Sequence, residues 1–283
     1  MKPKAALMLS VLLNRFHGSG SAPYLQLLTE EEMAQVKEFE VEATDLNLQQ
    51  PWQSLLSMHY SWMIEPLKKL TKELQVLIVS SFPENIQQKL AAQLQLQRLR
   101  EGLSPAVQHI FLNYLYEKMQ LKEALPLYLL PNSPFTILQT LSKQELIDVV
   151  DCLAMHDVAG ELRQIVDKQQ LARIFQVLTK KQQAYLKLVL HESDKSRAPR
   201  LGLDQWGGDP HRLLQVLHNR GMTRLSKALG AEHPDFILHL CYRLDIGRAK
   251  IIQNIGKQKE SEPVIKALTL QVTNAMNFVR SNA

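Results

Sequence analysis

The chain has 283 residues, of which 45% are hydrophobic and 22% charged, with a formal net charge of +5. This composition is typical of a soluble globular protein that is long enough for two or three ordinary domains. With only 6% aromatic residues and 11 glycines, a β-sandwich or barrel is disfavoured, whereas the abundant Leu, Gln, Ala and Lys favour helices. The sequence therefore predicts an all-α protein.

The first residues predict an amphipathic helix over 4–16. Its apolar run, Ala5 to Leu13, is interrupted by Ser10 and followed by Asn14 and Arg15, so a secretory signal peptide is the less favoured interpretation. No run elsewhere approaches the roughly 18 apolar residues that a membrane span requires. We therefore expect a cytoplasmic protein.

Further helix starts follow in chain order. Thr29 and Glu32 have the spacing of a capping box, in which each side chain binds the other residue's backbone N–H. Helices are then expected over 52–64, 66–80, 83–100 and 104–119, with Gly102 at a subdomain edge. Three prolines make 125–135 a corner or linker.

The segment beyond that corner contains a repeated pattern. Capping boxes are predicted at Ser142 with Glu145 and at Thr179 with Gln182, and an equivalent pair at Asp167 with Gln170. A shift of 25 places 138–153 on 163–178, and a shift of 51 places 162–190 on 213–241, with matching Leu, Gln and Arg positions. We interpret these as helical repeat units.

The stretch 213–255 is the clearest copy of this pattern. Its helices are joined by tight corners, at which Gly230 is expected in the left-handed conformation and Pro234 in a helical first turn. Asp245 is expected to be the N-cap of the next helix. The segment 194–212, rich in Gly, Pro and charge, is expected to be a linker. The predicted organisation is therefore an N-terminal helical domain over 1–102, a middle repeat domain over 103–193, the linker, and a C-terminal helical domain over 213–283.

The residues offer little catalytic chemistry. The histidines lack the spacings of common zinc sites, and Cys152 and Cys241 each lie in an apolar run without a CxxC partner, as buried thiols do. Gly207 and Gly208 lack the Lys-Ser of a phosphate loop, and Trp206 beside them is interpreted as a loop anchor in preference to a base-stacking platform. We expect no catalytic residue, no cofactor and no metal.

Charge is distributed unevenly along the chain. The region 30–45 is acidic, and the C-terminal third is basic. Its Arg and Lys alternate with apolar residues at helical spacing, which indicates first a solvated face, then docking to an acidic protein surface, and last nucleic-acid binding.

Three stretches resemble the flagellar rotor switch protein FliG, a family of stacked armadillo-like helical domains. Residues 4–10, Lys-Ala-Ala-Leu-Met-Leu-Ser, and the acidic run 28–33 are similar to its start. Residues 132–137, Asn-Ser-Pro-Phe-Thr-Ile, keep the Pro and Thr-Ile of its middle-domain motif Glu-His-Pro-Gln-Thr-Ile. Met222 to Leu229, Arg248-Ala249 and Pro263-Val264 are similar to its C-terminal domain.

The departures from this family concern torque generation. Arg248 matches one charged position, but the family's acidic pair falls near Ile255 and Gly256, and its later Arg falls on Ile265. The Met-Phe-x-Phe hinge motif is also absent. The resemblance therefore implies a scaffold similar to the SctK/YscK-type adaptor of the type III secretion sorting platform, with armadillo-like repeats in two or three subdomains.

The resemblance implies partners and the residues that meet them. An adaptor of this kind joins the inner-membrane ring to the switch or pod protein, is placed at the inner face of the bacterial inner membrane only through partners, and self-associates in a ring. Ala6, Leu9, Leu28 and Met33 would face the ring or a neighbouring copy, and the corner at Pro134 and Phe135 the switch-type partner. The basic residues of the C-terminal third would form a docking surface: Arg220, Arg224, Arg243 and Arg248.

Two other functions stay open at this point. The first is a nucleic-acid-binding helical-repeat protein. The second is a divergent enzyme. The missing torque charges are the only feature of the sequence that distinguishes a flagellar protein from a secretion-apparatus protein, and they favour the secretion apparatus.

Overall fold

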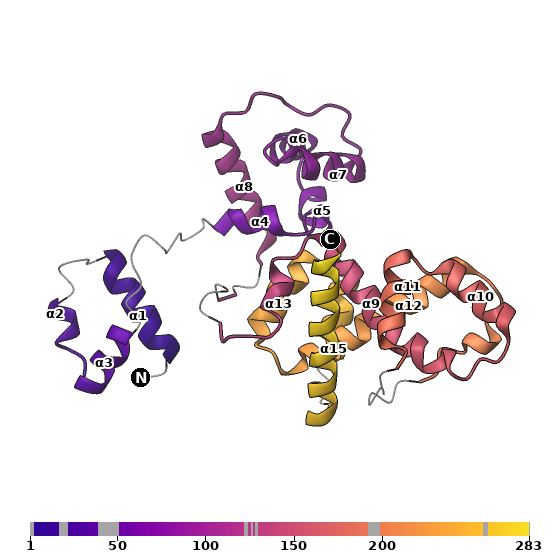
Figure 1. The fold of residues 1–283 in the computed structure, drawn as a ribbon. Helices are drawn as coiled ribbons and strands as arrows, with labels where there is room; N and C mark the ends of the chain where they lie inside the picture. Colours follow the sequence, from indigo (N-terminus) through magenta and orange to yellow (C-terminus); the bar gives the residue numbers. More distant parts are fainter. Residues whose placement is uncertain are drawn as a thin grey trace. The chain divides into compact units, whose positions relative to one another are not determined.

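The computed structural model describes residues 3–16, 22–38, 51–121, 124–125, 127, 130–191, 199–256 and 260–282. All regular structure within these ranges is helical and none of it is strand (Figure 1), which confirms the predicted all-α class. Contacts divide the chain into two units. Unit 1 comprises Met1–Ser57 and Pro66–Pro131, and unit 2 comprises Met58–Glu65 and Asn132–Ala283.

Unit 1 begins with a helical hairpin. Helices α1 (Pro3–Phe16) and α3 (Glu30–Glu38) pack against each other, with the short α2 (Ala22–Leu25) between them in the chain. The predicted capping box is confirmed, because the Thr29 backbone N–H donates to Glu32 Oε2 and the Glu32 backbone N–H donates to Thr29 Oγ1, both at 3.3 Å. The apolar residues in the hairpin's core are Ala6, Leu13 and Val36, with Leu9, Leu25 and Leu28 packed against them.

The rest of unit 1 consists of short helices. They are the 3-10 turn η2 (Pro51–Gln53), α4 (Ser54–Ser57), the end of α5 (Ser61–Lys68), α6 (Lys72–Val79), α7 (Glu84–Leu94) and α8 (Pro105–Met119). Helix α8 packs against η2 and α6, and α6 also packs against α7. The buried apolar side chains include Trp52, Leu55, Leu67, Ile78, Leu90, Leu112 and Leu115.

Three predicted helices in this part of the chain are wrong. The expected helix over 52–64 is broken between α4 and α5, since residues 58–60 are not helical, and the one expected over 83–100 ends at Leu94. The expected helix over 66–80 is two helices, because Thr71 caps α6 by accepting the Leu74 N–H at 3.5 Å. Buried Gln75 fixes the turn before the cap by donating to the carbonyls of Leu67 and Leu70 at 3.0 and 2.9 Å. A side-chain amide thus satisfies the carbonyls that end α5.

Unit 2 contains the remaining helices. They are η4 (Thr136–Gln139), α9 (Lys143–Leu162), α10 (Lys168–Val177), α11 (Lys180–Val189), η5 (Leu203–Gln205), α12 (Pro210–Ala228), η6 (Leu229–Ala231), α13 (Pro234–Arg243), α14 (Ile246–Ile255) and α15 (Glu262–Ser281). Helix α9 packs against α11, α12 and α15, and α12 also packs against α14 and α15. Helix α10 lies at the outer end of the unit, away from α13 (Figure 1).

Helix α9 is the centre of unit 2 because it is buried around most of its circumference. A helix that is apolar on all sides belongs in the interior of a helical protein. Its buried residues are Leu146, Val149, Val150, Cys152, Leu153, Ala154, Met155, His156, Val158, Ala159 and Leu162.

Helices α9 and α12 approach each other closely at Gly221. A Cβ added at Gly221 would lie 1.8 Å from the backbone oxygen of Val150, a distance that no side chain can occupy. Only glycine permits this backbone contact. The spacing of the two central helices is therefore set by a missing side chain.

The capping signals of unit 2 are mostly confirmed. Both boxes are formed, at Ser142 with Glu145 and at Thr179 with Gln182, and Asp245 caps α14 by accepting the Arg248 N–H at 3.1 Å.

Two local predictions in unit 2 are wrong. Asp167 caps α10 through Gln169, but Gln170 does not complete a box, because its amide donates to carbonyls of the 199–209 loop instead. Gly230 lies in η6 without a positive φ. The chain continues directly from α12 into this 3-10 turn, so no left-handed residue is needed there.

The repeated sequence pattern falls on helices of unequal length. The shift of 25 superposes the N-caps Ser142 and Asp167, but α9 has 20 residues and α10 has 10. The shift of 51 places the residues before α10 on the interior of α12, which is unbroken over Pro210–Ala228. The shift of 25 therefore aligns two helix starts but not two helix lengths, and the shift of 51 does not align the start of α10 with a helix start.

The expected linker 194–212 falls within unit 2. Its residues 194–198 lie outside the described residues, and α12 begins inside it at Pro210, with Asp209 as N-cap. The stretch 199–209 is anchored, because the Leu203 N–H donates to Glu161 Oε2 at 2.9 Å and Leu203 itself is buried. The described part of the segment is thus packed against α9.

We expect Gly221→Ala to destabilise unit 2 by about 2 to 4 kcal/mol, because the new methyl group would overlap the Val150 carbonyl. Gly160→Ala is the matched control on α9, since nothing lies within 4 Å of a Cβ added there. Its higher helix propensity should leave stability unchanged or raise it by up to about 1 kcal/mol. Urea unfolding followed by circular dichroism measures both, and equal effects would contradict the close approach.

Candidate functional site

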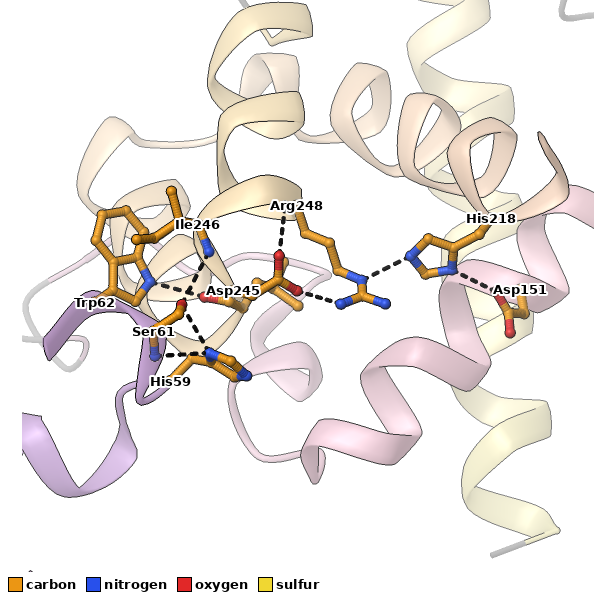
Figure 2. A network of polar contacts seen from close by, with 9 residues as sticks. His59, Ser61, Trp62, Asp151, His218, Asp245, Ile246 and Arg248 are labelled. Atoms are coloured by element: carbon orange, nitrogen blue, oxygen red, sulfur yellow. Dashed lines mark hydrogen bonds and ion pairs between the residues drawn. The ribbon is translucent and has the colours of Figure 1, made fainter. Parts of the chain in front are cut away.

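A series of polar contacts crosses unit 2 from α9 to α14 (Figure 2). Asp151 on α9 contacts Nδ1 of His218 on α12 at 2.8 Å, and Arg248 Nε on α14 donates to His218 Nε2 at 2.8 Å. The Nη1 of Arg248 pairs with Asp245, the N-cap of the same helix. These four half-buried side chains, Asp151, His218, Arg248 and Asp245, are called the Arg248 network.

The contacts of His218 fix its protonation. A guanidinium has only N–H donors, so the Nε2 that faces Arg248 must be the acceptor. Nδ1 then carries the proton and donates it to Asp151. His218 therefore bridges a guanidinium and a carboxylate through its two ring nitrogens.

Asp245 serves both the helix end and the ion pair. One carboxylate oxygen accepts the Arg248 backbone N–H and the other pairs with its guanidinium. Burial raises the pKa of Asp245, but the hydrogen bonds and charge of Arg248, together with the charge of His59, outweigh this effect and hold the pKa below its ordinary value. Asp245 is thus ionised at neutral pH.

The segment Met58–Glu65 lies beside this network within unit 2. The Trp62 indole N–H donates to the Leu244 carbonyl at 2.9 Å, and Ser61 Oγ accepts the Ile246 backbone N–H at 3.3 Å. Figure 2 shows both side chains reaching the start of α14. The segment therefore caps the corner between α13 and α14.

Arg224, predicted to lie on a solvated basic face, is 3% exposed, so this expectation is wrong. Its Nε and Nη2 donate to the two carboxylate oxygens of Asp157 on α9 at 3.2 and 2.6 Å, and its Nη1 donates to Gln271 on α15 at 2.7 Å. Arg224 thus joins three helices in the interior, where its partner sets the geometry.

The other two predicted arginines are also bonded within unit 2. Half-buried Arg243 donates to the carbonyls of Leu138 and Leu141, at 2.6 Å for Leu138, and burial lowers its pKa. Arg220 donates from Nη2 to the Arg200 carbonyl at 3.3 Å. All four arginines therefore make contacts within unit 2, and of these four only Arg224 is buried.

The predicted N-terminal partner residues lie mainly inside the α1–α3 hairpin. Ala6 is fully buried, Leu9 and Leu28 pack against the hairpin core, and Met33 is half-buried. The hairpin also exposes large apolar side chains. Its exposed large residues are Met8 and Leu12, each 45% exposed, with Tyr24 at 46% and Leu27 at 83%.

The corner at Pro134 is divided between surface and core. Pro134 is exposed, whereas Phe135 is 1% exposed. Ser133 holds the turn, because its Oγ accepts the Phe135 N–H at 3.0 Å. Phe135 therefore anchors the corner and leaves Pro134 at the surface.

Within the described ranges, no group of three or more His, Cys, Asp or Glu is placed to hold a metal ion. Cys152 and Cys241 are buried and unbridged, and burial raises their pKa values to about 12 and about 11. Both thiols therefore stay protonated at neutral pH and react poorly.

The Arg248 network could not be found from the sequence. His218 and Asp151 are 67 positions apart, and neither has a motif. The one available signal was Asp245, whose N-cap position is a local pattern.

Within the part of the chain that the structure describes, no helix is both long and apolar enough to span a bilayer.

Arg224→Met should destabilise unit 2 by about 3 to 5 kcal/mol, because it leaves the Asp157 carboxylate buried without a cation. Asp157→Leu alone should have a comparable effect for the converse reason. The double variant should lose clearly less than the sum of the two, since no unpaired charge remains. Urea unfolding of all four proteins tests this, and additive losses would contradict a direct buried pair.

Asp245→Asn keeps an N-cap side chain but removes the charge that pairs with Arg248. Because the folded-state pKa of Asp245 is lowered, its ionised form stabilises the fold above about pH 4, and this contribution is lost as the pH falls through the folded-state pKa. The unfolding midpoint of the unsubstituted protein should therefore exceed that of the variant at pH 7, and the difference should shrink below about pH 4. A difference that does not change with pH would contradict this assignment.

Comparisons of the chain with known protein families, curated proteins and solved structures found no match.

Proposed function

We propose that the chain is a non-enzymatic adaptor of a type III secretion or flagellar-type cytoplasmic complex, which links an inner-membrane ring to switch or pod proteins through armadillo-like helical surfaces. The resemblance of residues 4–10, 28–33, 132–137 and the C-terminal third to rotor switch proteins supports it. The all-helical described chain is compatible with it. Ile255, Gly256 and Ile265 stand where a rotor would carry charges, so torque generation is not part of the proposal.

The observation that carries the proposal is that the α1–α3 hairpin has apolar residues on two faces. Ala6 and Leu13 close the hairpin's own core, while Met8 and Leu12, one turn apart on α1, are exposed. A helix that is apolar on both sides requires a second partner for its outer face. An adaptor needs such a helical docking surface.

This arrangement assigns different roles to the N-terminal residues. Ala6, Leu9 and Leu28 hold α1 and α3 together, and Met8, Leu12 and Leu27 meet the partner. The exposed corner at Pro134 belongs to unit 2. It provides a second surface, which binds the switch or pod protein. Two surfaces on different units are what a protein that links two partners requires.

The test is co-purification of the full chain with the cytoplasmic part of the inner-membrane ring protein and with the pod protein of the same cells. Met8→Glu/Leu12→Glu should weaken ring binding at least tenfold and leave pod binding unchanged, because each glutamate would have to lose water in an apolar contact. Ala34→Glu, at an exposed position of α3, is the matched control and should bind both.

Three outcomes would contradict the proposal. They are failure of the unsubstituted chain to bind either protein, ring binding that survives the paired glutamates, and binding of DNA or RNA with a steep dependence on salt. The last result would favour the nucleic-acid alternative.

A further inference from the structure

The loop 199–209 holds one tryptophan in a fixed position. The Trp206 indole N–H donates to the Asp209 carbonyl at 3.0 Å, and Gln170 on α10 donates to the Trp206 carbonyl at 3.2 Å. Gly208 follows with a φ of +92°, which a residue with a side chain rarely adopts. Trp206 is half-buried, so part of its ring faces solvent from a rigid loop.

Two hollows flank this indole. One, of about 350 Å³, is lined by Leu201, Leu203, Leu213 and Val216. The other, of about 420 Å³, is lined by Val177, Pro210 and Leu214. Trp206 lines both, so a segment that crosses the indole can place one apolar side chain on each side of it.

Each hollow has one arginine among its lining residues. Arg212 lines the first hollow and Arg173 the second, and both side chains are exposed. Within the described part of the chain neither guanidinium has a hydrogen bond or ion pair. The carboxylate that lines the first hollow, Asp209, accepts the His211 and Arg212 backbone N–H groups as the N-cap of α12. Two cations are thus available to an incoming ligand.

We propose that the Trp206 surface, made of Trp206, Leu214, Val216, Arg173 and Arg212, binds an acidic segment of a partner protein in which large apolar side chains alternate with carboxylates. The apolar side chains fill the two hollows against the indole. The carboxylates pair with the guanidinium groups, whose fork matches a carboxylate in two hydrogen bonds. Charge and shape both specify this occupant.

The same residues are a poor nucleic-acid site. Binding of single strands uses several aromatic rings in a positive groove, whereas Trp206 is the one aromatic residue that lines these hollows, and the other apolar groups are aliphatic. A protein segment is therefore favoured. This proposal does not depend on the secretion or flagellar assignment, nor on the Met8 and Leu12 surface.

Fluorescence anisotropy with the full chain tests the proposal with four labelled probes. They are the peptide GSELEFELEGS, its lysine counterpart GSKLKFKLKGS, the apolar-free peptide GSESESESEGS, and a single-stranded oligothymidine. The first peptide should bind at least tenfold more tightly than each of the others, and its affinity should fall as salt is raised because part of the attraction is electrostatic. No binding of this peptide, or equal binding of the apolar-free or lysine peptide, would overturn the proposal. Tighter binding of the oligonucleotide would also overturn it.

Substitutions then locate the binding. Arg173→Glu/Arg212→Glu should weaken binding of the acidic peptide at least tenfold and strengthen binding of the lysine peptide. Val216→Asp, at an exposed position in the first hollow, should weaken the acidic peptide too. Arg280→Glu on α15 is the matched control, exposed and away from the surface, and should change neither affinity. Circular dichroism of each variant verifies folding. An equal loss in the control, or no loss in both surface variants, would overturn the proposal.

Discussion

The crossing of α9 and α12 is the contact on which unit 2 depends. At Gly221 the backbone of α12 meets the carbonyl of Val150 without an intervening side chain, and α11, α14 and α15 then pack on one or both of these helices. Close packing leaves no room to absorb a change in this distance. A change in this one backbone contact would therefore displace the helices that pack on α9 and α12, namely α11, α14 and α15.

Polar side chains fix the register of that crossing. Asp151 contacts His218 and Asp157 binds Arg224, and both pairs are separated by 67 positions. Partners that advance together along two helices show that the helices run in the same direction there. Parallel neighbours need a return connection, which α10, α11 and the 199–209 loop supply. Because burial of the Asp157–Arg224 pair costs desolvation, we expect this pair to contribute more to register than to net stability.

Local chemistry was predictable and long-range chemistry was not. The capping boxes at Thr29, Ser142 and Thr179 use residues three positions apart, so the sequence alone identifies them. Arg224 was assigned to a solvated face because its partner Asp157 is far away in the chain. Gln170 failed as a capping residue for the same reason, since the loop carbonyls that it binds come 33 and 36 positions later. For the candidate site, Asp245 was visible and His218 was not.

The placement of Met58–Glu65 in unit 2 affects how the protein can be divided. The chain passes between the two units three times, so no single cut separates them. A fragment that begins at residue 132 would leave the Leu244 carbonyl without the Trp62 indole and the Ile246 N–H without Ser61. A fragment that ends at residue 131 would carry that tryptophan with no corner to bind. The natural experimental piece is thus unit 2 together with the eight-residue segment 58–65, added as a peptide or fused to it.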